Sequence, residues 1–266
     1  MKNVRAPRKL AESDRPTLER LLGQEPEYTL FFRGNLDAWG FNDPDLEYWG
    51  VFNADGLETV LMRYRYNWSA YGPESADYGL YSEIAGHHPA GVSFITGKPA
   101  IGRQLTASLK GLRVVQENPS YFCSVRKLNP PAAGTETVRQ ATEEDIPALV
   151  ELYREDEMMQ RDEEAMARRI REGLYYLVEK GDLIVSAACT TAETSDAAMI
   201  GGVFTALAFR NLGCASSCVY HLCQDLLAEG KIPCLFYFSP AAGSIYRKLG
   251  FTDIGPWLLL SLKREA

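Results

Sequence analysis

The second half of the chain alternates between blocks of helical and strand-like hydrophobic periodicity, and each block predicts one element. Apolar residues at helical spacing predict helices over 143–155 and 162–172. A β-hairpin over 175–189 turns at Gly181 and Asp182, and a strand over 198–206 follows it. The remaining elements expected are a helix over 212–229, a strand over 233–238, a helix over 240–248 and a strand from 251. This order predicts an α/β fold, called α+β by some schemes, with a mixed sheet.

In the first half, the clearest pattern is a strict alternation of large apolar and polar residues. Met62, Tyr64, Tyr66 and Trp68 alternate with Arg63, Arg65 and Asn67. A period of two is typical of a half-buried strand. We therefore expect one strand here, with its aromatic side chains in the core of the first half.

Two stretches of the chain, 8–22 and 139–153, align without a gap. Each has the pattern of a strand end, an acidic turn, a proline in the first helical turn and an amphipathic helix. The ends of the two halves also correspond, because 121–128 and 257–264 are apolar strands that finish on basic residues. These similarities indicate a duplication. The residues that recur in the first pair are Arg8, Glu12, Asp14, Pro16, Leu18 and Leu21, which become Arg139, Glu143, Asp145, Pro147, Leu149 and Leu152.

A linker is expected between the two halves. Residues 129–136 read NPPAAGTE, and the two prolines cannot continue a helix. We therefore predict a first domain over 1–128, a linker over 129–136 and a second domain over 137–266.

Length and composition agree with two globular domains. The chain has 266 residues, of which 46% are hydrophobic, and its net charge of −7 comes from 35 acidic and 28 basic side chains. An acidic balance argues against a surface built to bind nucleic acid or anionic lipid. No apolar signal segment follows the basic start, and no apolar stretch is long enough to span a bilayer. We expect a cytoplasmic protein with no membrane partner; its oligomeric state is not predicted.

The junction between the strand over 198–206 and the next helix has the features of an anion site. The first N–H groups of a helix lack intrahelical acceptors, and the helix dipole favours negative charge there. Gly213 has no Cβ to obstruct an approaching phosphate, Ala215 and Ser216 are small, and Arg210 adds positive charge. The junction therefore predicts a phosphate site, although Gly213 could also be an ordinary turn glycine.

A metal site in the same helix is the rival interpretation. Cys214, Cys218 and His221 share one helical face, at spacings that allow joint coordination. The sequence supplies no Cys-x-x-Cys or His-x-x-x-His pair elsewhere to complete such a site, and His87 and His88 lie in the other half. We therefore expect no metal, and we expect the six cysteines to be reduced thiols that pack in the core.

The Arg-x-x-Gly-x-Ala pattern at 210–215, after a strand that reads VFT, resembles the acyl-CoA pyrophosphate loop of the GNAT superfamily of N-acetyltransferases. Residues 239–255 resemble a second motif of that family, with Ser239 where asparagine is common. The resemblance covers 136–266, and it implies two GNAT-like domains, each a mixed, mostly antiparallel twisted sheet flanked by helices. The residues that match the second motif are Ala242, Ile245, Tyr246, Lys248, Gly250 and Phe251.

The first half resembles the family only through its internal similarity to the second. Residues 91–105 are weakly similar to 233–246, but they contain no Tyr at the position of Tyr246. The first half also lacks the Arg-x-x-Gly-x-Ala loop. We therefore expect a degenerate copy that has lost the cofactor site.

The resemblance implies direct transfer of an acetyl group from acetyl-CoA to a primary amine of a small molecule or a peptide. Tyr246 is the implied catalytic acid, and main-chain groups of Val203 and Thr205 are implied to bind the pantetheine arm and the oxyanion. The candidate bases are Glu193, Asp196 or ordered water, and Met158 and Met159 are candidates for acceptor contact. The implied cofactor-binding residues are Val203, Phe204, Thr205, Arg210, Asn211, Leu212, Gly213, Cys214, Ala215, Ser216 and Ser239.

Two other functions are compatible with the same motifs. The chain could be a CoA-binding sensor or structural module without catalysis, in which Tyr246 is a core aromatic and Ser239 only a helix N-cap. It could also be an aminoacyl transferase of the tandem GNAT type, which uses charged tRNA. The net charge of −7 weighs against a tRNA partner.

Overall fold

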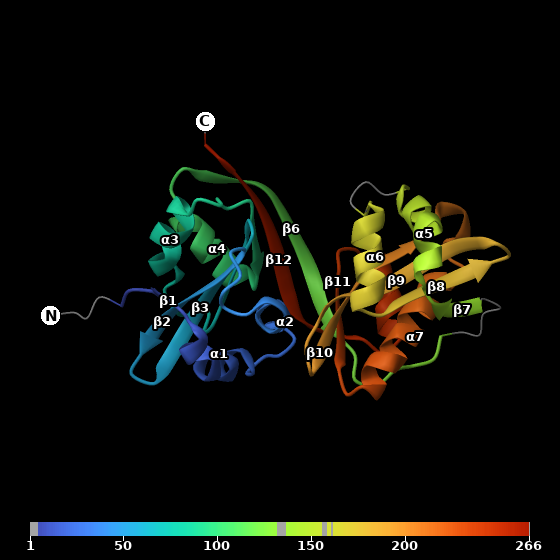
Figure 1. Ribbon diagram of the computed structural model, residues 1–266, viewed down its shortest axis with the longest axis horizontal. Helices are drawn as coiled ribbons and strands as arrows, with labels where there is room; N and C mark the ends of the chain where they lie inside the picture. Colours follow the sequence, from blue (N-terminus) through green and yellow to red (C-terminus); the bar gives the residue numbers. More distant parts are fainter. Residues whose placement is uncertain (1–4, 132–136, 156–158, 161, 266) are drawn as a thin grey trace. The chain divides into compact units, whose positions relative to one another are not determined.

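The computed structural model describes residues 5–131, 137–155, 159–160 and 162–265. The chain forms two compact units, shown in Figure 1. Unit 1 consists of Met1–Tyr121 together with Gly255–Ala266, and unit 2 consists of Phe122–Ile254. Two long strands, β6 (Leu112–Ser124) and β12 (Thr252–Arg264), each contribute residues to both units.

The strands of unit 1 follow one another in the order β1-β2-β3-β4-β5-β12. Neighbouring strands are antiparallel except β4 and β5, which are parallel and pair Asn67 with Phe94 and Trp68 with Ile95. Its other elements, in chain order, are β1 (Arg8–Lys9), η1 (Glu12–Asp14), α1 (Arg15–Leu22), α2 (Leu30–Trp39), β2 (Leu46–Asn53), β3 (Gly56–Tyr64), β4 (Asn67–Tyr71), η2 (Tyr78–Tyr81), α3 (Ser82–His87), β5 (Phe94–Gly97) and α4 (Pro99–Ser108).

Both faces of this sheet are covered. On one face, Trp68 and Ile95 pack against Ile101 and Leu105 of α4. On the other, the hydroxyl of Tyr48 in β2 donates to the carbonyl of Phe32 in α2 over 2.6 Å. Because both sides are buried, the strands of unit 1 carry large apolar residues on both faces.

The single strand expected around 62–68 is wrong. β3 ends at Tyr64 and β4 begins at Asn67, so Arg65 and Tyr66 form the turn of a hairpin. Arg65 has a φ of 55°, which places it in the left-handed region used by tight hairpin turns. Apolar and polar residue types keep alternating along the sequence through this turn, so periodicity alone did not reveal it. Tyr66 is consequently 48% exposed instead of lying in the core. The pairing of Arg63 with Trp68 places Trp68 on the face of Arg63 and not on that of Met62.

Unit 2 has a sheet in the order β7-β8-β9-β10-β11-β6. β10 and β11 are parallel, pairing Ala197–Ile200 with Ile232–Leu235, whereas β7–β8, β8–β9 and β9–β10 are antiparallel. Its elements, in chain order after β6, are β7 (Thr137–Gln140), η3 (Glu143–Asp145), α5 (Ile146–Tyr153), α6 (Glu163–Glu172), β8 (Tyr175–Lys180), β9 (Leu183–Glu193), β10 (Ala197–Thr205), η4 (Leu207–Phe209), α7 (Cys214–Ala228), β11 (Ile232–Tyr237) and α8 (Pro240–Lys248), followed by the start of β12.

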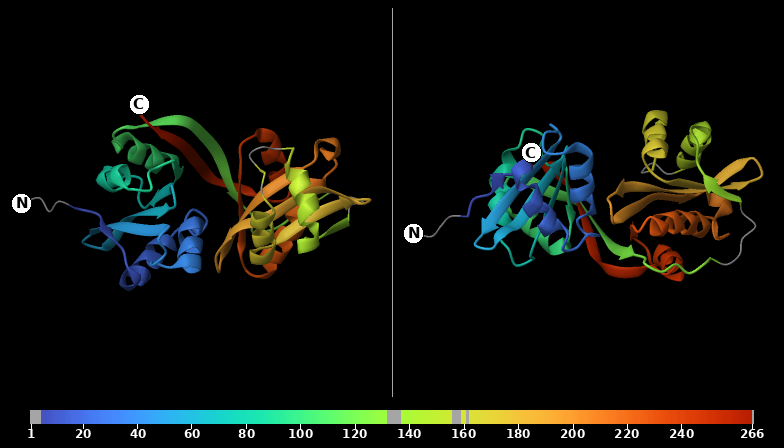
Figure 2. Two further views of the ribbon diagram at one scale, coloured as in Figure 1. Left: turned by 45° about the horizontal axis from the view of Figure 1, so that its top comes forward. Right: turned by 60° about the horizontal axis from the view of Figure 1, so that its bottom comes forward.

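Two helical layers cover this sheet, with α5 and α6 on one face and α7 on the other (Figure 2). Successive residues of β8 show the division. Tyr175 and Leu177 pack in the cluster with α5 and α6, whereas Tyr176 and Val178 pack in the cluster with α7 and α8. This alternation is the period-two geometry of a strand buried on both faces. The elements expected for the second half are confirmed, with ends that shift by at most four residues.

The two units repeat one another element by element, except that their last strands are exchanged. In unit 1 the neighbour of β5 is β12, and in unit 2 the neighbour of β11 is β6. The backbone N–H of Val125, directly after β6, donates to the carbonyl of Pro233 over 3.0 Å. The boundaries expected from the sequence, 1–128 and 137–266, describe the two sequence copies and stay a prediction. The compact units differ from them because each includes the closing strand of the other copy.

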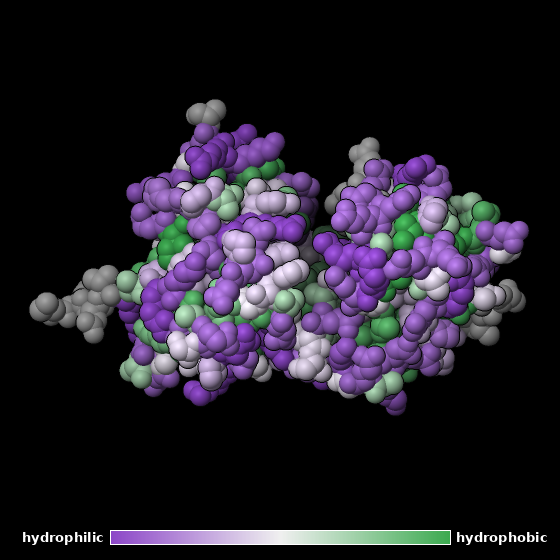
Figure 3. Space-filling model, viewed as in Figure 1, coloured by the Kyte–Doolittle hydropathy of each residue, from purple (hydrophilic) through white to green (hydrophobic). Residues whose placement is uncertain are grey.

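On the face seen in Figure 3, hydrophilic residues dominate the surface of each unit and apolar residues gather only in small patches. Within the described part of the chain, no helix has the length and apolar character needed to cross a bilayer.

Candidate active site

In unit 2 the parallel strands β10 and β11 separate at one end. Their pairing finishes at Ile200 and Leu235. β10 nevertheless continues to Thr205, where it still pairs with β9 on its other side. The edge of Gly201–Thr205 that faces β11 is therefore not used by the β10–β11 ladder. An extended molecule could hydrogen-bond to these main-chain groups as an added strand does.

A β-bulge shapes this free edge of β10. Gly201 lies opposite Cys189 and Phe204 lies opposite Ala187, so β10 carries one extra residue in between. Gly202 has a φ of 61°, and a Cβ there would lie 3.0 Å from Cys189 Sγ. The backbone conformation and the close packing both explain why glycine occupies this position.

The helix α7 begins directly after the loop that the sequence identified. Its N-cap is Gly213, with a φ of 89°, and a Cβ added there would have no atom within 4 Å. The backbone N–H groups of Ala215 and Ser216 have no acceptor among the described residues. This open helix start offers N–H donors and the positive end of the dipole to an anion. Asn211, with a φ of 62°, gives the loop a second left-handed residue.

Arg210 lies between the strand end and the helix start. Its Nε donates to the carbonyl of Thr205 over 3.2 Å, which ties the side chain back to β10. The side chain is exposed, and its other N–H groups bond to no described residue. Leu207 and Leu212 beside it are 64% and 51% exposed, so the mouth of the loop combines a cation with accessible apolar side chains.

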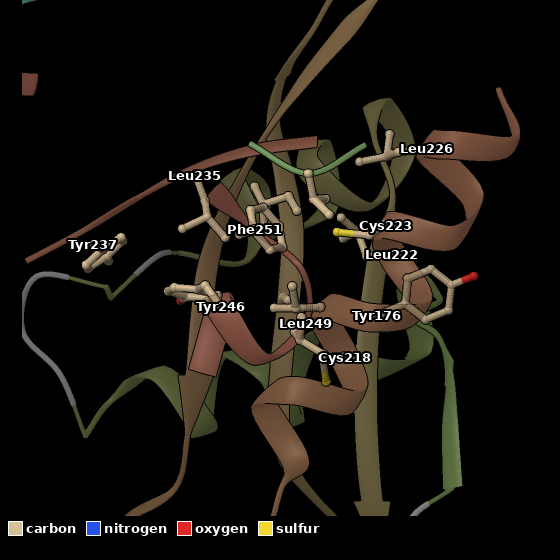
Figure 4. Close-up of a cluster of buried hydrophobic side chains, with 14 of the residues drawn as sticks. Tyr176, Cys218, Leu222, Cys223, Leu226, Leu235, Tyr237, Tyr246, Leu249 and Phe251 are labelled. Carbon is tan, nitrogen blue, oxygen red and sulfur yellow. The ribbon is translucent and has the colours of Figure 1, made fainter. Parts of the chain in front are cut away.

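Tyr246 lies on α8, which follows β11. Its ring contacts Tyr237 at 6.0 Å and Phe251 at 5.8 Å between centroids, and only 8% of the residue is exposed (Figure 4). Burial raises the pKa of its phenol well above the usual value of 10. Tyr246, Cys214 and the partly buried Val203 all pack in one cluster, so the residues of the two motifs meet on one face of the sheet.

Ser239 is the N-cap of α8, and its hydroxyl accepts the backbone N–H of Ala242 over 3.2 Å. This hydrogen bond gives Ser239 the helix N-cap role that the sequence offered as the alternative to cofactor binding. Ser239, Ala242 and Tyr246 follow one another at spacings of three and four residues, so they share one side of α8. Phe238, just before Ser239, is 64% exposed.

The side chains of two residues of the expected cofactor site make contacts away from the separated strands. The side chain of Phe204 is buried in the cluster with α5 and α6, 5.7 Å from the ring of Tyr153. Thr205 shares a hydrogen bond of 2.8 Å with the hydroxyl of Ser186. Only the main chain of these two residues faces the separated strands.

The two candidate bases lie at the opposite end of β10. Glu193 forms an ion pair of 2.7 Å with Lys231, and Asp196 accepts from the hydroxyl of Thr194 over 2.9 Å. Seven residues of strand, at about 3.3 Å each, separate Asp196 from Val203. Neither carboxylate can reach a group bound at the bulge. Of the candidate acceptor contacts, Met158 lies outside the described residues and Met159 packs against the α5–α6 cluster.

The three residues of the rival metal site make packing contacts and do not converge on one point. His221 stacks on Tyr176 with 6.1 Å between ring centroids, and Cys214 and Cys218 lie in the buried cluster. Over the described ranges, no three His, Cys, Asp or Glu side chains are grouped closely enough to hold a metal ion. All six cysteines are buried and form no disulfide.

Unit 1 has an equivalent pair of parallel strands, β4 and β5, but the carboxylate of Glu25 connects their ends. Lys98, at the end of β5, donates to both carboxylate oxygens of Glu25 over 2.8 and 2.6 Å. Tyr71, at the end of β4, donates to the same carboxylate over 2.9 Å. The ammonium of Lys98 also lies 4.6 Å from the ring centre of Tyr28. One carboxylate thus ties together the two strand ends that stand apart in unit 2.

The sequence of residues 155–260 matches the family model of the GNAT acetyltransferases. The segment over 155–260 is therefore similar to the GNAT acetyltransferases. The matched segment contains β10, the loop with Gly213, α7, β11 and α8, so the family assignment rests on the region that forms the candidate site. No curated protein matches this chain in sequence.

Solved structures show the same fold over nearly the whole chain. A GCN5-related N-acetyltransferase from Sphaerobacter thermophilus is 18% identical with a TM-score of 0.65, covering 99% of this chain and 96% of its own. A Drosophila protein is 9% identical with a TM-score of 0.72, at 97% and 98% coverage. A tandem GNAT protein from the clavulanic acid biosynthesis pathway is 12% identical with a TM-score of 0.58, also at 97% and 98%. These structures therefore share the fold of this chain over both of its halves.

One contact of the site had no signal in the sequence. The hydroxyl of Tyr153, on α5, donates to the carbonyl of Gly202 at the bulge. Tyr153 ends an ordinary amphipathic helix and belongs to no motif, so its pattern predicted only a core position. The two consecutive glycines at 201 and 202 were the available hint that another group approaches β10 closely.

Proposed function

We propose that the protein is an N-acetyltransferase that moves the acetyl group of acetyl-CoA directly to a primary amine. The observation that carries this proposal is the pairing of an open helix start at Gly213 with a separated strand edge at Gly201–Thr205. The helix start suits a diphosphate, and the strand edge suits the amide-bearing arm that joins a diphosphate to a thioester. The match of residues 155–260 to the GNAT acetyltransferase family model supports the same co-substrate.

In the proposed reaction the amine nitrogen bonds to the carbonyl carbon and the carbon–sulfur bond breaks. The backbone N–H of Val203 at the bulge donates to the carbonyl oxygen as negative charge develops on it. Tyr246 gives its phenolic proton to the departing thiolate. Since burial raises the pKa of Tyr246, the phenol stays protonated at neutral pH, as an acid of this kind requires.

The amine loses its proton through water in this proposal. Glu193 is held by Lys231 at the far end of β10, and Asp196 lies in the adjacent turn. No carboxylate that the sequence suggested is therefore placed to take the proton. The acceptor is a small-molecule or peptide amine, and the acidic net charge of −7 argues against a tRNA-dependent aminoacyl transfer.

Gly213 and Gly230 offer a matched pair of substitutions to test the proposal. Both have a positive φ, 89° and 77°, and a Cβ added at either position would have no atom within 4 Å. Gly213 precedes α7, whereas Gly230 follows it. A glutamate at either position costs about 1 kcal/mol of backbone strain, but only Gly213→Glu places a carboxylate against the proposed diphosphate.

The measurement is acetyl-CoA binding by calorimetry, followed by thioester consumption with a panel of primary amines. We expect Gly213→Glu to weaken binding by about 100-fold and Gly230→Glu to leave it within about twofold. Equal binding by the two variants would move the site away from α7. Binding by the wild-type protein without turnover on any amine would favour a CoA sensor.

A further inference from the structure

The bulge in β10 is held from the side of α5 by two buried tyrosines. The hydroxyl of Tyr153 donates to the carbonyl of Gly202 over 2.5 Å, and the hydroxyl of Tyr175 donates to that of Tyr153 over 2.9 Å. Tyr153 is 2% exposed and Tyr175 is 3% exposed. This chain of two hydroxyls therefore ends on one particular main-chain carbonyl, shielded from water.

The direction of that carbonyl fixes the direction of the next N–H group. A peptide unit is planar and trans, so the C=O of Gly202 and the N–H of Val203 point in opposite directions. Tyr153 draws the carbonyl toward α5, and the N–H of Val203 accordingly points away from α5. Val203 packs against the cluster of α7 and α8, which contains Tyr246.

The covalent structure alone does not impose this orientation. Gly202 has no Cβ, so its backbone can turn the peptide between Gly202 and Val203 with little steric resistance. Residues 202 and 203 fall between the ladder pairs Gly201–Cys189 and Phe204–Ala187, where the regular β9 register is interrupted. The hydrogen bond from Tyr153 is thus the contact that selects one orientation of this peptide.

We propose that Tyr153 is a positioning residue for acyl transfer, which aims the N–H of Val203 at the thioester carbonyl by holding the carbonyl of Gly202. Tyr175 supports Tyr153 by donating a hydrogen bond to the hydroxyl of Tyr153. This inference rests on the proposed function, since it assigns the oxyanion donor of that reaction. A donor that strengthens only as charge develops raises turnover without tightening substrate binding.

Three tyrosine-to-phenylalanine variants test the proposal, because each keeps its ring and loses one hydroxyl. Tyr153→Phe removes the bond to Gly202, and Tyr175→Phe removes only its support. Tyr176→Phe is the matched control: its hydroxyl donates to Asp225 over 2.5 Å, on the opposite face of the sheet. We expect Tyr153→Phe to lower kcat by about tenfold with acetyl-CoA affinity within about twofold, Tyr175→Phe to have a smaller effect, and Tyr176→Phe to have none.

A second readout on the ligand-free protein separates this inference from the proposed function. In hydrogen exchange, Tyr153→Phe should speed exchange of the amides over 201–205 while Tyr176→Phe leaves them unchanged. Equal exchange in the two variants, or a kcat loss that the Tyr176→Phe control shares, would overturn the positioning role. A wild-type protein that fails to bind acetyl-CoA would defeat the proposed function, and the exchange result would still decide whether Tyr153 holds the bulge.

Discussion

The guanidinium of Arg139 donates two hydrogen bonds to the carboxylate of Asp145, of 2.8 Å from Nη1 and 2.7 Å from Nη2. Asp145 also accepts the backbone N–H of Thr142 over 2.7 Å, so it fastens the strand β7 to the start of α5. In unit 1, Arg8 and Asp14 form the same two bonds, of 2.8 and 2.6 Å. The polar residues that recur between the two halves therefore form a structural clamp in each unit, which explains their repetition without a catalytic role.

Asp145→Asn should destabilise the protein in a pH-dependent way. The hydrogen bonds from Arg139 are the main cause that lowers the pKa of Asp145 to about 2. A depressed pKa contributes stability above the unfolded pKa near 4, and this contribution disappears as the pH falls through about 2. We expect a loss of about 2 kcal/mol at pH 7, measured by urea unfolding, that shrinks steadily below pH 4.

Asp14→Asn is the control for that measurement. Arg8 is more exposed than Arg139, at 52% against 37% of the side chain, so water screens its pair more strongly. Asp14→Asn should therefore lose less stability at pH 7 than Asp145→Asn. A deficit in Asp145→Asn that stays constant from pH 7 to pH 3 would show that packing, not charge, is responsible.

Tyr246→Phe should lower kcat by about 100-fold while acetyl-CoA affinity changes by less than about twofold. The reason is that the phenylalanine keeps the ring contacts with Tyr237 and Phe251 and removes only the proton donor. Tyr237→Phe is a suitable comparison, since it removes the hydroxyl that bonds to Asp253 over 2.7 Å on the same cluster. If both variants retained full turnover, Tyr246 would be a core aromatic only.

Gly201→Ala should destabilise unit 2 by about 2 kcal/mol through overpacking. The added methyl group would lie 2.6 Å from Cγ2 of Thr191. Thr191→Ser removes that methyl and keeps the hydroxyl that donates to the carbonyl of Met199 over 3.2 Å. The double variant should recover most of the loss in a double-mutant cycle. Gly202→Ala should not be rescued by Thr191→Ser, because its strain comes from a φ of 61°.

Calorimetry should find one acetyl-CoA per chain. In unit 1, Glu25 binds both Lys98 and Tyr71 and so closes the strand ends that correspond to β10 and β11. Opening that space would require breaking an ion pair and a hydrogen bond that both converge on one carboxylate. Gly213→Glu should therefore abolish nearly all binding heat, and a residual site of similar affinity would show that unit 1 also binds the co-substrate.

A fragment over 122–254 should fold, whereas one over 137–266 should not. The first contains the end of β6, whose Cys123 lies in the core with α7 and α8, followed there by Val125. The second lacks both residues and leaves the β11 edge unpaired, which favours aggregation. Dispersion of amide signals in NMR spectra of the two fragments checks this. A well-folded 137–266 fragment would show that β6 contributes little to unit 2.

Much of the second half could be predicted from the sequence because its periodic blocks are long and its motifs lie at element ends. The exchange of closing strands could not. Residues 121–128 and 257–264 have the same apolar pattern, so either segment satisfies the edge of β5 or of β11 equally well. Local pattern specifies that a strand forms, but not which neighbour it takes.

The candidate site shows the same division between local and distant information. The glycine loop and the second motif are contiguous in sequence, and the structure places Cys214 and Tyr246 in one cluster. Tyr153 reaches Gly202 from 49 residues away, through a single hydroxyl that leaves no spacing to recognise. The turn at Arg65 was missed for another reason, since apolar and polar residue types alternate along the sequence through the turn as they would in one strand.

The exchanged strands also reverse the order in which the chain can be completed during synthesis. Unit 2 has all of its residues once Ile254 has left the ribosome. Unit 1 begins first but must wait for Gly255–Ala266, which are translated after all of unit 2, before β5 gains its neighbour. Unit 1 thus finishes folding after unit 2, and until then it depends on the nascent chain remaining unaggregated.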